Sequence, residues 1–209
     1  SSDLTVNSCI MLLPSVANCH VISVEGLAGE SGKMHPVQEA MIATSGAQCG
    51  FCTPGFVMSL YGLYVKGSKP SKQQILNSLQ GNLCRCTGYG PIIEAALRVT
   101  NAFSTTSHEV NSKNKKWKKK LIELMDRKRP LCPENRACFF LPRTVSELKE
   151  ILFHNKDGTI VAGSTDVGLW VSKALRNITP IIFIGQIEEL KHIKTQKDKI
   201  VLGATASYT

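Results

Sequence analysis

Four cysteines, spaced C-x2-C-x31-C-x-C, constrain the fold of this chain more than any other feature. They are half of the eight cysteines in the sequence, namely Cys49, Cys52, Cys84 and Cys86. Each pair stands in a glycine-rich segment leading to a proline, Pro54 or Pro91, and proline is favoured in the first turn of a helix. Helix N-termini carry unpaired N–H groups and partial positive charge, which favour an anionic group. The spacing therefore predicts a metal site held by thiolates.

The tight Cys84-Arg85-Cys86 pair helps to separate the possible metals. Structural zinc also takes four cysteines, but its usual pattern is two C-x2-4-C knuckles. Cysteine thiolates equally hold iron–sulfur clusters, and a two-iron cluster spreads its ligands over two atoms, so ligands one residue apart are compatible with it. Disulfides are a weaker alternative, because bonds within such close pairs would be strained or close very small loops.

Two segments around these cysteines resemble a known family. Residues 48–55 read QCGFCTPG and residues 81–89 read GNLCRCTGY. Both closely resemble the helical two-iron domain of the molybdenum hydroxylases, the xanthine dehydrogenase and aldehyde oxidase family. The resemblance implies that the four cysteines ligate the [2Fe–2S] cluster nearest the molybdenum cofactor. It also implies that Gln48 and the region of Cys86 contact the pterin of that cofactor, on another domain or subunit.

The start of the chain carries a further cysteine with a possible ligand role. By itself Cys9 is expected to be a small buried hydrophobe, and residues 20–26 alternate as a strand does. The VNSC segment at residues 6–9 also resembles the end of a plant-type ferredoxin domain. The resemblance implies that Cys9 is the fourth ligand of a second [2Fe–2S] cluster, whose C-x4-C-x2-C ligands would precede residue 1. We interpret residues 1–30 as the remnant of that domain, and Cys19 as structural.

Residues 31–103 are predicted to form a four-helix [2Fe–2S] bundle, from apolar residues at helical spacing. One helix begins at Pro36, and a second has Thr53 as N-cap with Pro54 at its first position. Ser71 and Gln74 form a capping box for the third. Pro91 opens the fourth.

Residues 104–136 are predicted to be a basic linker, because residues 113–120 read KNKKWKKK. An interleaved tryptophan in a lysine run is an alternative sign of a nucleic-acid or anionic surface, but no further nucleic-acid motif follows. Cys132 and Cys138 near its end have no metal-like partners. Much of the formal net charge of +9 is concentrated here. No apolar run is long enough to cross a bilayer, and reduced thiols fit the cytosol, so we expect a cytoplasmic protein without membrane contact.

Residues 137–209 read as an α/β segment. A strand-like entry at residues 139–142 precedes a capping box of Thr144 and Glu147. A β run then breaks into a Gly-Ser-Thr turn before a helix, a second buried strand spans residues 180–185, and a hairpin turns around residues 196–198. The segment resembles the start of the flavin domain of xanthine dehydrogenases. The resemblance implies that seven residues of the turn contact FAD: Ile160, Val161, Ala162, Gly163, Ser164, Thr165 and Asp166.

The expected fold class is therefore α+β, a four-helix cluster domain followed by the first part of an α/β FAD-binding domain. The resemblance implies an oxidoreductase part that relays electrons from a molybdopterin-binding domain or large subunit through [2Fe–2S] clusters to FAD, with NAD+ or oxygen as acceptor. Xanthine or hypoxanthine oxidation is the expected reaction, within a larger homo- or hetero-oligomer. No catalytic acid or base is expected in this chain. An aldehyde oxidase, a zinc-stabilised binding module and a flavin-free ferredoxin-like carrier are the alternatives.

Overall fold

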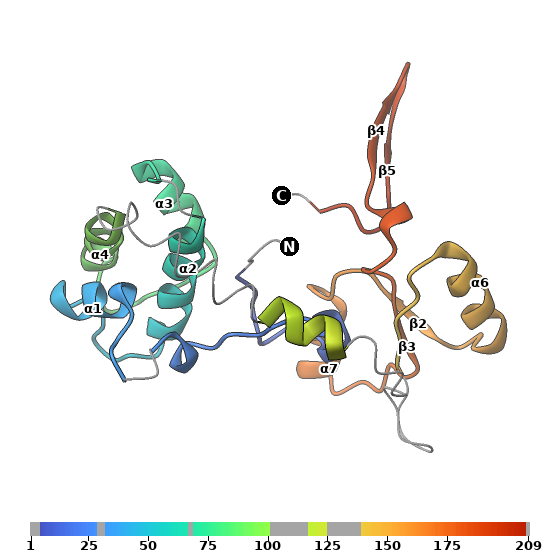
Figure 1. The fold of residues 1–209 in the computed structure, drawn as a ribbon, viewed down its shortest axis with the longest axis horizontal. Coiled ribbons are helices and arrows are strands. Elements are labelled where there is room, and N and C mark those ends of the chain that lie inside the picture. The colour runs from blue at the N-terminus through green and yellow to red at the C-terminus, as the bar shows by residue number, and fades with distance from the viewer. Residues whose placement is uncertain (1–4, 29–31, 67–68, 101–116, 125–138, 208–209) are drawn as a thin grey trace. The chain divides into compact units, whose positions relative to one another are not determined.

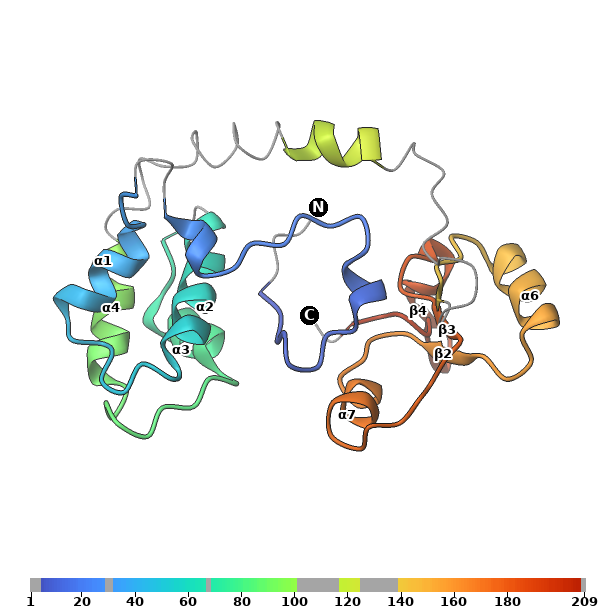
Figure 2. The same ribbon diagram turned by 90° about the horizontal axis from the view of Figure 1, so that it is seen from below.

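The computed structural model describes residues 5–28, 32–66, 69–100, 117–124 and 139–207. The chain divides into two compact units. Unit 1 comprises Ser1–Thr5 and His20–Glu123, and unit 2 comprises Val6–Cys19 and Leu124–Thr209. Helices predominate in unit 1, whereas unit 2 combines helices with two small sheets (Figures 1 and 2). No helix in the described ranges is long and apolar enough to cross a membrane.

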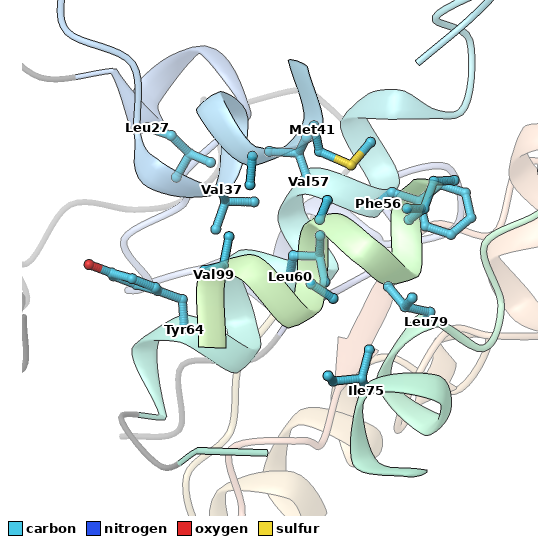
Figure 3. Packing of buried hydrophobic residues seen from close by; sticks show 14 of the residues in the cluster. Leu27, Val37, Met41, Phe56, Val57, Leu60, Tyr64, Ile75, Leu79 and Val99 are labelled. Atoms are coloured by element: carbon cyan, nitrogen blue, oxygen red, sulfur yellow. The ribbon is translucent and has the colours of Figure 1, made fainter. Parts of the chain in front are cut away.

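Unit 1 is built from α1 (Pro36–Ala43), α2 (Thr53–Val65), α3 (Lys72–Leu79) and α4 (Gly90–Thr100), after a short 3-10 turn η2 (Glu25–Leu27). Each of the four helices contributes at least one fully enclosed side chain to a shared core, and the largest of these are Val37, Phe56, Ile75 and Ile92. Figure 3 shows how the buried hydrophobic side chains of this core pack against one another. Each such side chain is worth about 1.5–3 kcal/mol when removed from water, so the core fixes the helices that flank the cysteine segments.

Two helix starts in unit 1 lie one residue earlier than predicted, since α2 has Cys52 as its N-cap and α4 begins at Gly90 instead of Pro91. The predicted capping box of α3 is present, because Ser71 accepts from Gln74 N and Gln74 accepts from Ser71 N. The prediction that Thr53 caps α2 is wrong, because Cys52 occupies the N-cap position and Thr53 is the first helical residue. The turn that carries Cys52 runs directly into the helix, since Phe56 N donates to Cys52 O. The buried Thr53 hydroxyl has no hydrogen-bond partner among the described residues.

Two other segments of unit 1 differ from expectation. Residues 20–24 form no strand and lead into η2, because the side chains of Ile22 and Val24 pack on the helical core and no strand within the described ranges lies beside them. Within the basic segment, residues 117–124 are helical, and Trp117 stacks on His20 with ring centroids 4.4 Å apart. The rest of the predicted linker, with Cys132, lies outside the described residues, and so does Cys138 just after it.

Unit 2 contains a parallel sheet with strand order β1-β3-β2, formed by β1 (Phe139–Phe140), β2 (Thr159–Val161) and β3 (Ile181–Phe183). Its register pairs Ile181 with both Phe139 and Thr159. Helix α6 (Val145–His154) connects β1 to β2, and α7 (Val167–Ser172) connects β2 to β3. The two helices lie on different sides of the sheet (Figures 1 and 2).

The core of unit 2 joins β3 and the segment after it, at Ile182, Ile184 and Ile187, to the apolar face of α6. Short 3-10 turns η1 (Leu13–Val16) and η3 (Glu188–Leu190) complete the unit. The predicted hairpin is present as β4 (Ile193–Gln196) and β5 (Lys199–Leu202), and it projects from the sheet (Figure 1).

The predicted capping box of α6 is only half formed. Thr144 accepts from Glu147 N, but the Glu147 carboxylate accepts from Arg143 N at 2.7 Å instead of from Thr144 N. The carboxylate of Glu189 also accepts from Val145 N at 2.9 Å, so η3 helps to satisfy the first turn of α6.

Candidate metal centre and flavin turn

The first cysteine segment is a tight turn ahead of α2. Gly50 between the two cysteines has a φ of 83°, in the left-handed region that glycine adopts at little cost. Thr53 N donates to Gly50 O at 3.2 Å and closes the turn. Cys49 is exposed and Cys52 is half-buried. The neighbouring Phe51 is 95% exposed, which is unusual for a large apolar side chain.

The second cysteine segment connects α3 to α4. Gly81, Gly88 and Tyr89 all have positive φ values, so the chain turns sharply on both sides of the cysteines. Cys84 is buried, at 9% exposure, and belongs to the core of unit 1, whereas Cys86 is exposed. As with Phe51 in the first segment, a large apolar side chain is left in solvent, because Leu83 is 83% exposed.

Asn82 ties the second segment to α2. Its side-chain nitrogen donates to Ser59 Oγ at 2.9 Å and to Leu79 O at 3.3 Å. Its side-chain oxygen lies so close to Gly55 that a Cβ there would stand 2.6 Å from it. Sequence reasoning missed Asn82, and only its place in the GNLC segment could have drawn attention to it. The contacts set the spacing between the two cysteine segments.

The four cysteine side chains come together in two pairs. Cys49 and Cys86 lie close enough to shift each other's pKa, and so do Cys52 and Cys84. The six described cysteines are free thiols, so the disulfide alternative does not hold for them. Among the residues with described positions, no three His, Cys, Asp or Glu side chains surround a single metal-ion position. The arrangement consists of two neighbouring thiol pairs, the ligand number that a two-iron cluster requires.

Backbone and hydroxyl donors control the ionisation of these thiols. The N–H of Phe51 lowers the pKa of Cys49, and the neighbouring side chain of Cys49 raises the pKa of Cys86. Burial raises the pKa of Cys52. The hydroxyl of Thr87, and after it the backbone N–H groups of Thr87 and Cys86, lower the pKa of Cys84 to about 7. Metals bind thiolates, so these donors favour the form that a metal needs.

The other predicted metal ligand, Cys9, belongs to unit 2. Its side chain is exposed, contrary to the expectation of a buried small hydrophobe, and its N–H donates to the side chain of Asn7 at 3.1 Å. The next residue, Ile10, places its carbonyl against Gly168 at the start of α7. The segment that carries Cys9 is therefore packed close to the predicted flavin turn. Cys19 is likewise exposed. Gln48 is exposed beside Cys49 in unit 1.

The predicted flavin contacts begin in β2 and continue into the turn after its carboxyl end, the edge at which open α/β sheets bind ligands. Ser164 is 7% exposed and has a φ of 132°, a strained conformation of the kind found at functional sites. Gly163 has open space around it, because a Cβ there would meet nothing within 4 Å. Thr165 and Asp166 are exposed.

The other predicted flavin contacts differ in access. Ile160 is 48% exposed and Ala162 is half-buried, whereas Val161 is 1% exposed and could offer only its backbone to a ligand. A surface hollow of about 410 Å³ elsewhere in unit 2 lies between β1 and α6, where Phe140, Glu150 and His154 line it. That hollow contains none of the predicted flavin contacts.

Comparison with known proteins matches both units. A model described as "[2Fe-2S] binding domain" matches residues 23–97, and "FAD binding domain in molybdopterin dehydrogenase" matches residues 134–209. A xanthine dehydrogenase from Blastobotrys adeninivorans is 57% identical over 100 residues, which are 47% of this chain and 7% of that protein. Aldehyde oxidase 3 from Mus musculus is 31% identical over 244 residues, covering 100% of this chain and 18% of that protein.

Among solved structures, quinoline 2-oxidoreductase from Pseudomonas putida 86 aligns with 42% of this chain and 52% of its own, at 33% identity and a TM-score of 0.36. The chain spans less than a fifth of the length of the two curated relatives.

Proposed function

Because the chain belongs to the xanthine dehydrogenase and aldehyde oxidase family of molybdenum hydroxylases, we propose that it is the electron-transfer portion of such an enzyme. Electrons would arrive from a molybdopterin site on another domain or subunit, pass over [2Fe–2S] clusters to FAD, and leave to NAD+ or oxygen. The proposed overall reaction is the oxidation of xanthine or hypoxanthine in the cytoplasm. The substrate site would lie outside this chain.

The observation that carries the proposal is the convergence of four thiols in two pairs at the starts of two helices. Cys49 with Cys86, and Cys52 with Cys84, are the proposed ligands of the cluster. When bound, a two-iron cluster takes up and releases one electron at a time. The protein's part is to present thiolates in a fixed arrangement, to aim N–H groups at them and to keep Cys84 out of water, all of which tune such a centre.

A neighbouring domain is expected to cover the exposed side of this site. Phe51 and Leu83 are almost fully exposed although each lies next to a proposed ligand. Exposed apolar side chains grouped around a site are typical of surfaces that other domains cover. We therefore propose that the molybdopterin-binding domain or large subunit packs here, with Gln48 near the pterin, within a larger oligomer.

For the flavin, the proposed contacts are Ile160 through Asp166. The support is the strained, buried Ser164 and the open Gly163 at the carboxyl edge of the sheet. Backbone N–H groups of such a turn can hold phosphate. The packing of Ile10 on Gly168 supports a second cluster at Cys9 beside the flavin, as a relay would need.

Aldehyde oxidation is the second candidate. The mouse aldehyde oxidase matches the whole chain at 31% identity, so the match does not separate the two substrate classes. The electron-transfer role is common to both.

Metal analysis and electron paramagnetic resonance of the purified protein test the proposal. We expect iron and acid-labile sulfide, a two-iron signal after reduction, and visible colour. Cys49→Ser and Cys86→Ser should lose most of the iron, whereas Cys19→Ser should retain it, because the Cys19 thiol is exposed and hydrogen-bonds only to the nearby Ala17 carbonyl. Colourless protein with stoichiometric zinc, or unchanged iron in Cys49→Ser, would contradict the proposed ligands.

A further inference from the structure

Thr87 contacts the most buried of the four cysteine sulfurs with two groups. Its hydroxyl oxygen lies 3.1 Å from Cys84 Sγ, and its backbone N–H donates to the same sulfur at 3.5 Å. Cys84 is 9% exposed, so water contributes little to its solvation. The interactions of this sulfur with Thr87 therefore count for more than they would at the exposed Cys49 or Cys86.

The direction of the hydroxyl hydrogen bond follows from its surroundings. Tyr89 N–H donates to Thr87 Oγ1 at 3.2 Å, which engages the oxygen as an acceptor and leaves the hydroxyl hydrogen available. A cysteine that ligates a metal is a thiolate and has no proton to donate. In the metal-bound protein the hydroxyl must therefore be the donor and Cys84 Sγ the acceptor.

The same turn holds the hydroxyl in place. Tyr89 has a φ of 68°, which points its N–H back at Thr87. The Tyr89 hydroxyl accepts from Cys84 N at 3.2 Å, and its ring lies edge-on to the buried Phe56 at a centroid distance of 6.2 Å. Cys84, Thr87 and Tyr89 thus form a closed ring of hydrogen bonds anchored on the core.

We propose that Thr87 tunes the reduction potential of this centre, by donating its hydroxyl hydrogen to Cys84 Sγ. The inference rests on the proposed [2Fe–2S] function. Uptake of one electron increases the negative charge on the ligand sulfurs, and a hydrogen bond to a charged acceptor strengthens as that charge grows. The hydroxyl therefore stabilises the reduced state more than the oxidised state and makes the potential less negative.

Thr87→Val in the full-length holoprotein tests this inference, because valine keeps the shape of threonine and removes the hydroxyl. We expect the equilibrium constant for one-electron reduction to fall about tenfold, which corresponds to a potential about 59 mV more negative. The measurement is a redox titration followed by electron paramagnetic resonance, with iron content measured in parallel. Thr87→Ser retains the hydroxyl and should keep the wild-type potential.

Thr44→Val is the matched control, because its hydroxyl donates to Ala40 O at 3.0 Å in α1 and is not one of the donors to the sulfurs. It should leave the potential unchanged. A wild-type potential in Thr87→Val with full iron content would overturn the inference and leave the proposed function standing. Loss of iron from both Thr87→Val and Thr87→Ala, with retention in Thr87→Ser, would also overturn it, because the hydroxyl would then hold the centre instead of tuning it. Absence of iron from the wild-type protein would overturn both proposals.

Discussion

Cys84 is the residue of the candidate metal centre whose surroundings differ most from water. Its burial in the core of unit 1 raises its pKa, but this effect is outweighed by hydrogen bonds from Thr87 and from the N–H of Cys86, and the pKa falls to about 7. An unfolded cysteine has a pKa of about 8.5. The fold therefore favours the thiolate at neutral pH, before any metal binds.

This pKa difference makes a testable prediction for the metal-free protein. Alkylation of Cys84, followed by mass spectrometry as a function of pH, should show its midpoint near pH 7 in the folded protein and near about 8.5 in urea. The folded pKa is the lower one, so the thiolate of Cys84 stabilises the fold fully above about pH 8.5, and this contribution is lost as the pH falls through about 7. Thr87→Val should raise the folded midpoint. Equal midpoints in folded and unfolded protein would contradict the prediction.

Gly50 gives a second prediction at the residue scale. A Cβ there would meet no atom within 4 Å, so the cost of Gly50→Ala comes only from its φ of 83°. Left-handed backbone costs a residue with a side chain about 1–2 kcal/mol, and we expect a loss of that size in the free energy of unfolding measured by urea denaturation. Gly90→Ala is the control, since it also meets nothing within 4 Å and has no left-handed φ. Equal effects of the two substitutions would argue against the strained turn.

Among the elements, α2 and the segment after α3 depend on each other through Asn82. Its bonds to Ser59 and Leu79 join the two parts of unit 1 that carry the cysteine pairs. The helices could pack through their apolar faces without this side chain. The spacing of the pairs would then be set less firmly.

Asn82→Ala should therefore lower iron retention as well as stability. We expect the free energy of unfolding, measured by urea denaturation, to fall by about 1 kcal/mol because the hydrogen bonds are missing. A chelator should also remove the iron faster. Asn77→Ala is the control, because its side chain bonds only to Gln73 on the exposed face of α3. Equal chelation rates for the two variants would show that Asn82 has no role in positioning the cysteines.

The sequence predicted helices and strands correctly where a cap, a proline or turn residues agreed with the spacing of the apolar residues. Helices α1 to α4 combine apolar spacing with a proline or a cap at their start, and the β4–β5 hairpin has polar residues at its turn. The alternating residues 20–26 were wrongly predicted to be a strand, because alternation signals burial on one side but not whether a partner strand exists. The helix at residues 117–124 was missed although Trp117, Leu121 and Leu124 stand at helical spacing, because the surrounding lysines led the segment to be interpreted as a linker.

The candidate site was predictable only in part, for a related reason. Cysteine spacing identifies candidate ligands because it can be read directly from the sequence. The pairing of Cys49 with Cys86, and of Cys52 with Cys84, crosses the fold and depends on how α2 and α4 pack. The roles of Thr87 and Asn82 depend on side-chain directions, which no pattern in the sequence encodes.

At the scale of the whole molecule, the two units are not simple halves of the chain. Val6–Cys19 belongs to unit 2, although residues on both sides of it along the chain belong to unit 1. The backbone of Ile10 lies directly against Gly168, where any side chain would overlap the Ile10 carbonyl. The absence of a side chain at Gly168 is therefore a condition for this segment to pack on α7.

Gly168→Ala tests this packing. Because backbone atoms stand on both sides of the contact, the added methyl group can be accommodated only if the segment moves. We therefore expect the free energy of unfolding to fall by about 1–3 kcal/mol. Proteolysis within residues 6–19 should also become faster. Thermal unfolding and limited proteolysis with mass spectrometry are the measurements. Gly163→Ala, which meets nothing within 4 Å, should change neither. Unchanged proteolysis in Gly168→Ala would show that the segment is not held by this contact.

The positions of the two tryptophans allow the two units to be observed separately. The chain has two tryptophans. Trp117 lies in unit 1, whereas Trp170 lies in unit 2, with the Arg176 guanidinium 5.6 Å from its ring centre. Each unit therefore carries one tryptophan. Trp117→Phe leaves only the tryptophan emission of unit 2, and Trp170→Phe leaves only that of unit 1, so with selective excitation of tryptophan the melting of each unit can be followed separately within the intact chain.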